Sequence, residues 1–187
     1  MDVIAKIDAE FRAIETGDAA LAAAAVAPDW IDHELHTEAS LSSVRGPAAL
    51  LVVSAWMRSA MPNLRFADAI TVADDNHALT YVVLTGQHTG PFVVYRNGRA
   101  VRVIPPTGRR IEVRHAHVHE LRDGEVVSHR AVRDDLAMLG QLGVLPPTPA
   151  GLARGIGWKI SGRARTAVQE VTEAMRAAAA TAPQPVA

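Results

Sequence analysis

The sequence Arg-Ile-Glu-Val-Arg-His-Ala-His-Val-His-Glu-Leu, residues 110 to 121, has the two-residue alternation of a β-strand. Because successive strand side chains point to opposite faces, His115, His117 and His119 share one face with the isoleucine, the first valine and the leucine of the segment. These apolar neighbours indicate that the face looks inward. Three imidazoles directed toward a core favour a polar-lined cavity in which protons move or a ligand is held.

The regions on either side of this segment predict an α+β fold. Turn sequences such as Asn97-Gly98 and Asp123-Gly124 separate candidate strands. The strands are expected at residues 65–72, 77–88, 92–95, 99–104, 110–121 and 125–133. Apolar residues at helical spacing predict helices near residues 4–16, 19–27, 46–61 and 134–142. Helices followed by an antiparallel sheet are typical of α+β proteins, and a curved sheet wrapped around the N-terminal helices would leave a conical pocket.

Length and composition restrict the class of protein. The 187 residues carry a formal net charge of -1, which fits one domain plus an appendage and does not suggest a nucleic-acid partner. The absence of cysteine excludes disulfides and thiolate chemistry. The acidic first turns are unlike a secretory signal, and the apolar run 19–27 is too short to cross a bilayer, so we expect a cytoplasmic protein without a membrane partner.

The composition changes after Gly143. Three prolines between residues 146 and 149 predict a linker, and apolar residues from Ile160 to Met175 predict an amphipathic helix. Residues 182–187 are expected to be disordered. The predicted organisation is therefore one domain at 1–143 and an appendage at 144–187.

Five blocks in this order resemble the SnoaL-like polyketide cyclase family, whose members are often labelled ester cyclases. The blocks are Met61–Phe66, Leu84–Phe92, Ile104–Arg110, Asp123–His129 and Asp134–Gly143. The resemblance covers roughly residues 3–143. It implies an NTF2-like (cystatin-like) conical barrel with a central pocket, assembly as a homo-oligomer (dimer or tetramer), and chemistry on a small-molecule substrate without a cofactor.

The resemblance also implies which residues form the site. Asp134 matches the family's acid/base, His117 matches a cavity histidine that assists it, and His33 matches a polar residue that lines the pocket. Substrate contacts are further expected from residues near these positions. They are Trp30, His88, His115 and His119.

The implied reaction is an intramolecular aldol closure of a polyketide-like β-keto ester. One group must remove a proton from carbon and another must deliver one to oxygen, which a carboxylate and an imidazole in an apolar cavity can do. Asp134 also fits a plain helix N-cap, and His117 fits a hydrogen-bonded core residue. Hydration, epoxide opening or hydrolysis in the same pocket, and ligand binding without catalysis, remain open alternatives.

The three histidines also invite a metal interpretation. Alternate strand residues lie about 6.5 to 7 Å apart, which lets two of the three reach one ion but strains the third. The resemblance implies a metal-free site, so we expect no metal. The segment 93–103 is longer than the usual family loop, His129-Arg130 stands where many members carry His-Trp, and the extension beyond residue 143 lies outside the family core.

Overall fold

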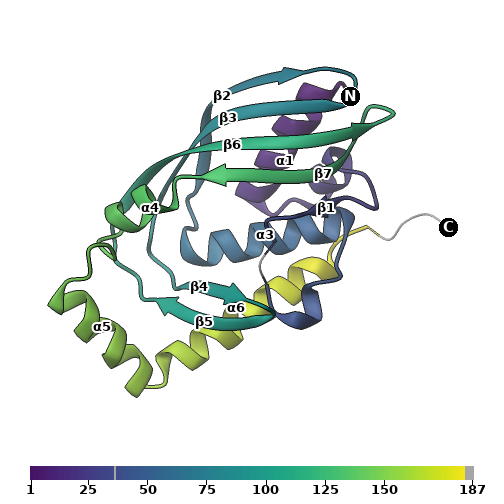
Figure 1. Cartoon of the computed structure of the whole chain (residues 1–187). Helices are drawn as coiled ribbons and strands as arrows, with labels where there is room; N and C mark the ends of the chain where they lie inside the picture. Colours follow the sequence, from purple (N-terminus) through teal and green to yellow (C-terminus); the bar gives the residue numbers. More distant parts are fainter. Residues whose placement is uncertain (36, 184–187) are drawn as a thin grey trace.

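The computed structural model, which describes residues 1–35 and 37–183, shows an α+β fold in which a curved sheet arches over N-terminal helices (Figure 1). The described part of residues 1–60 contains three helices, one short strand and one 3-10 helix. They are α1 (Val3–Thr16), α2 (Ala19–Ala25), β1 (Ile31–Asp32), η1 (Ala39–Leu41) and α3 (Gly46–Ala60). The predicted fold class is confirmed.

Six longer strands follow. They are β2 (Arg65–Ala73), β3 (His77–Gln87), β4 (Phe92–Arg96), β5 (Arg99–Ile104), β6 (Arg110–Arg122) and β7 (Glu125–Arg133). The main sheet has the order β1-β7-β6-β3-β2, with β1 parallel to β7 and the other pairs antiparallel. Strands β4 and β5 form a separate two-stranded ribbon, so the main sheet is curved and open in the described residues.

Local sequence explains where the first helices begin and end. The Asp2 carboxylate accepts a hydrogen bond from the Ala5 amide at the start of α1, and Gly17 ends the helix with a left-handed φ of 76°. Asp18 caps α2 in the same way as Asp2 caps α1. The helices therefore follow one another closely and pack as a layer under the sheet.

The core lies between this helical layer and the concave face of the sheet. Buried residues of α1 and α3, such as Ile7, Phe11 and Leu50, pack against inward side chains of β3 and β6, such as Leu84 and Val113. The two-residue alternation predicted for residues 110–121 is confirmed, because every odd-numbered residue of this stretch is buried. The histidines therefore belong to the interior.

The opposite, convex face of the sheet is partly apolar. Side chains of four neighbouring strands form this face and are exposed. They include Ile70, Val72, Leu79, Tyr81 and Val132. Homo-oligomer assembly remains a prediction, and this face has the character of a surface that a second copy would cover.

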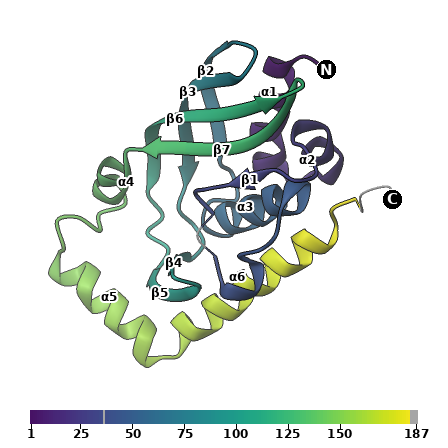
Figure 2. The same ribbon diagram turned by 45° about the vertical axis from the view of Figure 1, so that its right-hand side comes forward.

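The C-terminal region differs in part from its prediction. Residues expected in a proline linker form helix α5 (Pro149–Ile160), after a short helix α4 (Asp135–Gln141), and α6 (Arg163–Ala180) is the predicted amphipathic helix. Thr148 caps α5 with its hydroxyl, and Pro149 occupies the first turn, where its missing N–H costs nothing. Figure 2 shows α5 and α6 along an edge of the molecule, away from the main sheet. The tail prediction falls mostly on residues 184–187, which lie outside the described residues.

Helix α6 and the β4–β5 ribbon share a second, smaller core. Val171 and Met175 of α6 pack with Val93 and Tyr95 of β4, and the Tyr95 hydroxyl lies 3.0 Å from that of Thr172. The ribbon is the predicted hairpin with Asn97-Gly98 at its tip, where both residues have positive φ. No helix in the described chain is long and apolar enough to cross a membrane.

Candidate active site

Strand β6 directs three imidazoles into the core. His115 and His117 are each 5% exposed and His119 is fully buried. Their rings form a row, with 5.6 Å between the ring centres of His115 and His117 and 6.3 Å between those of His117 and His119. The face of β6 predicted from the sequence is thus the inner face of the sheet.

A fourth histidine, His129 of β7, joins this row to a carboxylate. Its Nδ1 lies 2.9 Å from Asp32 Oδ1, and its Nε2 lies 2.8 Å from His117 Nδ1. Both hydrogen bonds are shielded from water, since the side chains of His129 and Asp32 are 9% and 4% exposed. Asp32, His129 and His117 therefore form a continuous buried chain of hydrogen bonds, called the relay below.

Backbone pairing places the first two members of the relay. Strand β1 runs parallel to β7 with Asp32 opposite His129, and His129 also faces His119 across the β6–β7 pair. An irregularity of register between Glu120 and Leu121 shifts the phase of β7, so that Val126 and His129 both point inward. Without this bulge His129 would face the convex side.

Aromatic side chains enclose the relay. The Trp30 ring stacks on His129 at 6.1 Å, and Phe11 and Phe66 meet His117 edge-on, with centroid distances of 5.0 Å and 6.3 Å. His117 Nε2 is buried and has no hydrogen-bond partner among the described residues. The end of the relay opposite Asp32 is therefore a buried ring nitrogen in an apolar environment.

A second pair of titratable groups lies beside the relay. Glu10 of α1 is 1% exposed, and its Oε2 lies 3.2 Å from His119 Nε2. One ligand atom from each of Glu10, His119 and His129 falls within 4.8 Å of the others, and a carboxylate with two imidazoles is a donor set that zinc accepts. Asp32 would then orient His129, as carboxylates do for metal-bound histidines. The metal-free site remains a prediction, which metal analysis of the purified protein tests.

The site shifts the pKa values of its histidines in opposite directions. Burial is the largest influence on His129 and disfavours its charged form, but its hydrogen bond to Asp32 and the nearby carboxylates outweigh burial and raise its pKa above 6.5. Burial, followed by the charge of His129, lowers the pKa of His117 far below its usual range. Burial, then Arg133 and His129, lowers the pKa of His115 to about 4. Among His115, His117 and His129, the site therefore favours the protonated form only at His129.

The predicted catalytic carboxylate does not join this cluster. Asp134 is exposed, and its Oδ1 accepts a hydrogen bond from the Ala137 amide at 2.9 Å, which makes it the N-cap of α4. No hydrogen bond or ion pair within residues 1–35 and 37–183 joins it to His117. Its predicted role in catalysis is untested, and the carboxylate that the structure couples to His117 is Asp32.

The other predicted site residues divide into two groups. Trp30, His115 and His119 belong to the cluster. His33 is exposed in the turn that follows β1, whereas its neighbour Asp32 takes the inward position. His88 is buried elsewhere, with Nδ1 3.1 Å from the Thr107 hydroxyl.

Sequence reasoning missed three members of the cluster. Glu10 lies three residues after Ile7 and four before Ile14, inside the buried stripe of α1, so its position was readable from helical spacing. Asp32 directly precedes His33, the residue that the family resemblance indicated. His129 carried no such signal, since only the bulge in the β6–β7 pair turns it inward.

A curved sheet that covers N-terminal helices and holds titratable side chains on its concave face defines an NTF2-like α+β protein. The chain belongs to the SnoaL-like polyketide cyclase family, whose sequence model matches residues 6–142. Comparison with curated protein sequences gives no match.

Solved structures share the fold. IdmH from Streptomyces antibioticus, a proposed polyketide cyclase, is 23% identical, with a TM-score of 0.56 over 76% of this chain and 99% of IdmH. TsrD from Streptomyces laurentii is 22% identical, with a TM-score of 0.55 over 75% of this chain and 93% of TsrD. AclR from Streptomyces galilaeus, a proposed hydroxylase, is 18% identical, with a TM-score of 0.55 over 86% of this chain and 92% of AclR.

Proposed function

We propose that this protein is an acid/base cyclase that closes a ring in a polyketide-like β-keto ester by intramolecular aldol addition, without a cofactor. Family membership supports a cyclase-type role. The observation that carries the proposal is the relay from Asp32 through His129 to His117, which ends in the unpartnered Nε2. In this proposal His117 touches the substrate, and Asp32 and His129 act through it.

The relay has two forms that differ by one proton. In the base form, His129 is neutral, His117 donates its Nδ1–H to His129 Nε2, and His117 Nε2 is a free acceptor. In the acid form, His129 is an imidazolium that donates to Asp32 and to His117 Nδ1, and His117 Nε2 carries a proton. These tautomers are assigned from the hydrogen-bond geometry.

The reaction uses both forms in turn. His117 Nε2 removes a proton from the carbon between two carbonyls, while the Nδ1 proton of His117 passes to His129 Nε2. The resulting carbanion attacks a second carbonyl carbon of the same molecule and forms the new carbon–carbon bond. The alkoxide then takes the proton back from His117 Nε2, so the ring-closed product has the composition of the substrate.

The carboxylate of Asp32 makes the acid form accessible inside an apolar core. An imidazolium without a counter-charge would be strongly disfavoured there, as the lowered pKa of His117 illustrates. Asp32 compensates the charge at a distance of 2.9 Å. The relay therefore separates the two tasks: His117 exchanges the proton, and His129 stores it.

The experiment uses a linear β-keto ester and two assays. Chromatography with mass spectrometry follows ring closure, and NMR follows hydrogen–deuterium exchange at the carbon between the two carbonyls. His117→Gln should lower both rates by about 10² to 10⁴. His77→Gln is the matched control, because His77 belongs to the same sheet but its side chain is 52% exposed. Full activity of His117→Gln would refute the proposal, and solvent oxygen in the product would indicate hydrolytic or hydratase chemistry instead.

A further inference from the structure

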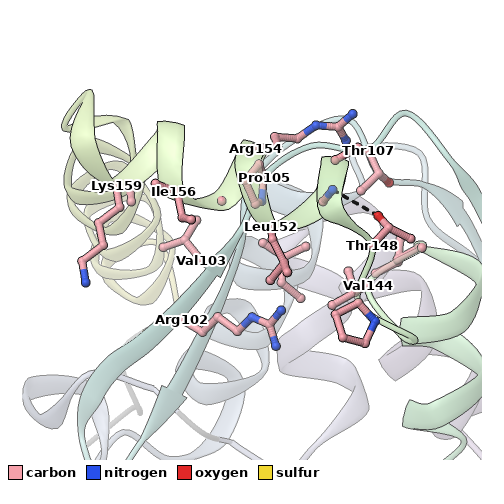
Figure 3. Close-up of a pocket in the computed structure, with 18 of the residues that line it drawn as sticks. Arg102, Val103, Pro105, Thr107, Val144, Thr148, Leu152, Arg154, Ile156 and Lys159 are labelled. Atoms are coloured by element: carbon pink, nitrogen blue, oxygen red, sulfur yellow. Dashed lines mark hydrogen bonds between the residues drawn. The ribbon is translucent and has the colours of Figure 1, made fainter.

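A hollow of about 840 Å³ lies between β5, α5 and α6 (Figure 3). No member of the imidazole cluster lines it. Its volume is in the range of pockets that hold small organic molecules. The hollow is therefore separate from the proposed acid/base site and has the size of a second binding site.

The charges around this hollow have one sign. The whole chain has 19 lysines and arginines and 20 acidic residues, whereas the hollow is lined by five basic residues and by no aspartate or glutamate. The basic residues are Arg102, Arg109, Arg154, Lys159 and Arg165. None of the five forms an ion pair with a carboxylate in the described chain. Their combined field attracts an anion.

The same hollow offers apolar surface. Leu152 and Ile156 lie one turn apart on α5 and line it, yet they are 56% and 58% exposed. Ile104 and Val103 of β5 provide apolar side chains from the ribbon. Exposed aliphatic side chains that surround a concave surface gain free energy when an apolar body covers them.

Arg102 of β5 lies where the charged and apolar surfaces of the hollow meet. In Figure 3 the Arg102 side chain extends below Leu152 in the direction of Val144. The Lys159 side chain lies at the opposite end of the hollow from Val144. A ligand lying along α5 would therefore meet aliphatic groups along its length and a cation at either end.

We propose that this hollow binds an amphipathic organic anion, a molecule with an aliphatic or ring-bearing body and a carboxylate or phosphate head. The head pairs with the basic residues, with Arg102 as the main contact, and the body covers Leu152 and Ile156. This binding is distinct from the acid/base reaction and does not depend on it.

Isothermal titration calorimetry of the full chain tests the proposal with probes that separate head from body. Dodecanoate and dodecyl phosphate, below their micellar concentrations, should bind at one site per chain and more weakly as salt is added. Dodecyltrimethylammonium, which has the same tail and a positive head, should bind at least about tenfold more weakly. Acetate and inorganic phosphate, which lack the tail, should show no saturable binding. The tighter of the two dodecyl anions identifies the head group.

Paired variants locate the site. Arg102→Gln should weaken dodecanoate binding about five- to tenfold, less than the loss of a buried charge-assisted contact, because Arg102 is exposed to solvent. Arg163→Gln, an exposed arginine of α6 that does not line the hollow, should leave binding unchanged. Ile156→Asn should weaken binding, whereas Ile160→Asn, one turn further along α5 and outside the hollow, should not.

Three results would overturn the proposal. One is equal affinity for dodecanoate and dodecyltrimethylammonium. Another is an equal effect of the Arg102 and Arg163 substitutions. The third is a chain that binds neither dodecyl anion. A mass in sedimentation that also falls on Ile156→Asn would show that a second copy covers the hollow.

Discussion

Replacing Asp32 by Asn removes the charge that stabilises the His129 imidazolium and leaves the side-chain volume almost unchanged. The lost interaction is a buried, charge-assisted hydrogen bond of 2.9 Å between groups that are 4% and 9% exposed. Such bonds contribute about 1.5 to 3 kcal/mol, so the pKa of His129 should fall and the rate should be about 10- to 150-fold lower. Residue-resolved NMR titration of the imidazoles measures the pKa change without a substrate.

The same substitution changes how stability depends on pH. The pKa of His129 in the folded protein lies above its unfolded value of 6.5, so its contribution to stability is fully present below pH 6.5 and is lost as pH rises through the folded pKa. Urea unfolding should show this loss in the natural chain and a smaller one in Asp32→Asn. Asp29→Asn is the control, since that carboxylate is 61% exposed and pairs with Arg122. A His129 pKa that is the same in the natural chain and in Asp32→Asn would refute the relay.

Three further predictions concern other positions. Burial lowers the pKa of His115 from 6.5 to about 4, so protonation should favour the unfolded chain by up to about 3 kcal/mol as pH falls from 6.5 toward 4. Unfolding of His115→Gln should depend less on pH over this range. A Cβ at Gly90 would lie 1.8 Å from the Ser59 carbonyl oxygen, so Gly90→Ala should cost about 1 to 3 kcal/mol in thermal unfolding, unlike Gly157→Ala, where no atom lies within 4 Å. Asp134→Asn should keep the stability of α4, because Asn caps a helix as well as Asp does. A turnover lowered by about 10² to 10⁴ would establish the predicted catalytic role of Asp134. An unchanged turnover would mean that Asp134 only caps the helix.

The strands could be predicted because their signals are local. Turn residues such as Asn97-Gly98 and Asp123-Gly124 fixed the ends of the hairpins, and the alternation around His117 identified the inner face of β6. Helix α5 was missed because Pro146 and Pro147 precede it, Pro149 begins it and three glycines lie within it. A side-chain cap from Thr148 and the favourable first-turn place of Pro149 allow it to begin despite them.

The candidate site could be predicted only in part, because its connections are not local. Asp32 and His129 are 97 residues apart and meet through the parallel pairing of β1 with β7. Sequence spacing says nothing about this pairing, nor about the bulge that turns His129 inward. The same family match that identified His117 directed attention to Asp134, which is the residue that caps α4 in this chain.

The two departures from the family pattern, the lengthened segment 93–103 and the C-terminal extension, are not independent of each other. Val93 and Tyr95 of the ribbon are 0% and 3% exposed because Val171 and Met175 of α6 cover them, and the family match ends at residue 142, before either helix. A chain with the long ribbon alone would expose that apolar surface, whereas a chain with the extension alone could still pack α6 against α3. In evolution the long ribbon should therefore depend on the extension, and relatives that carry the ribbon should also carry α6.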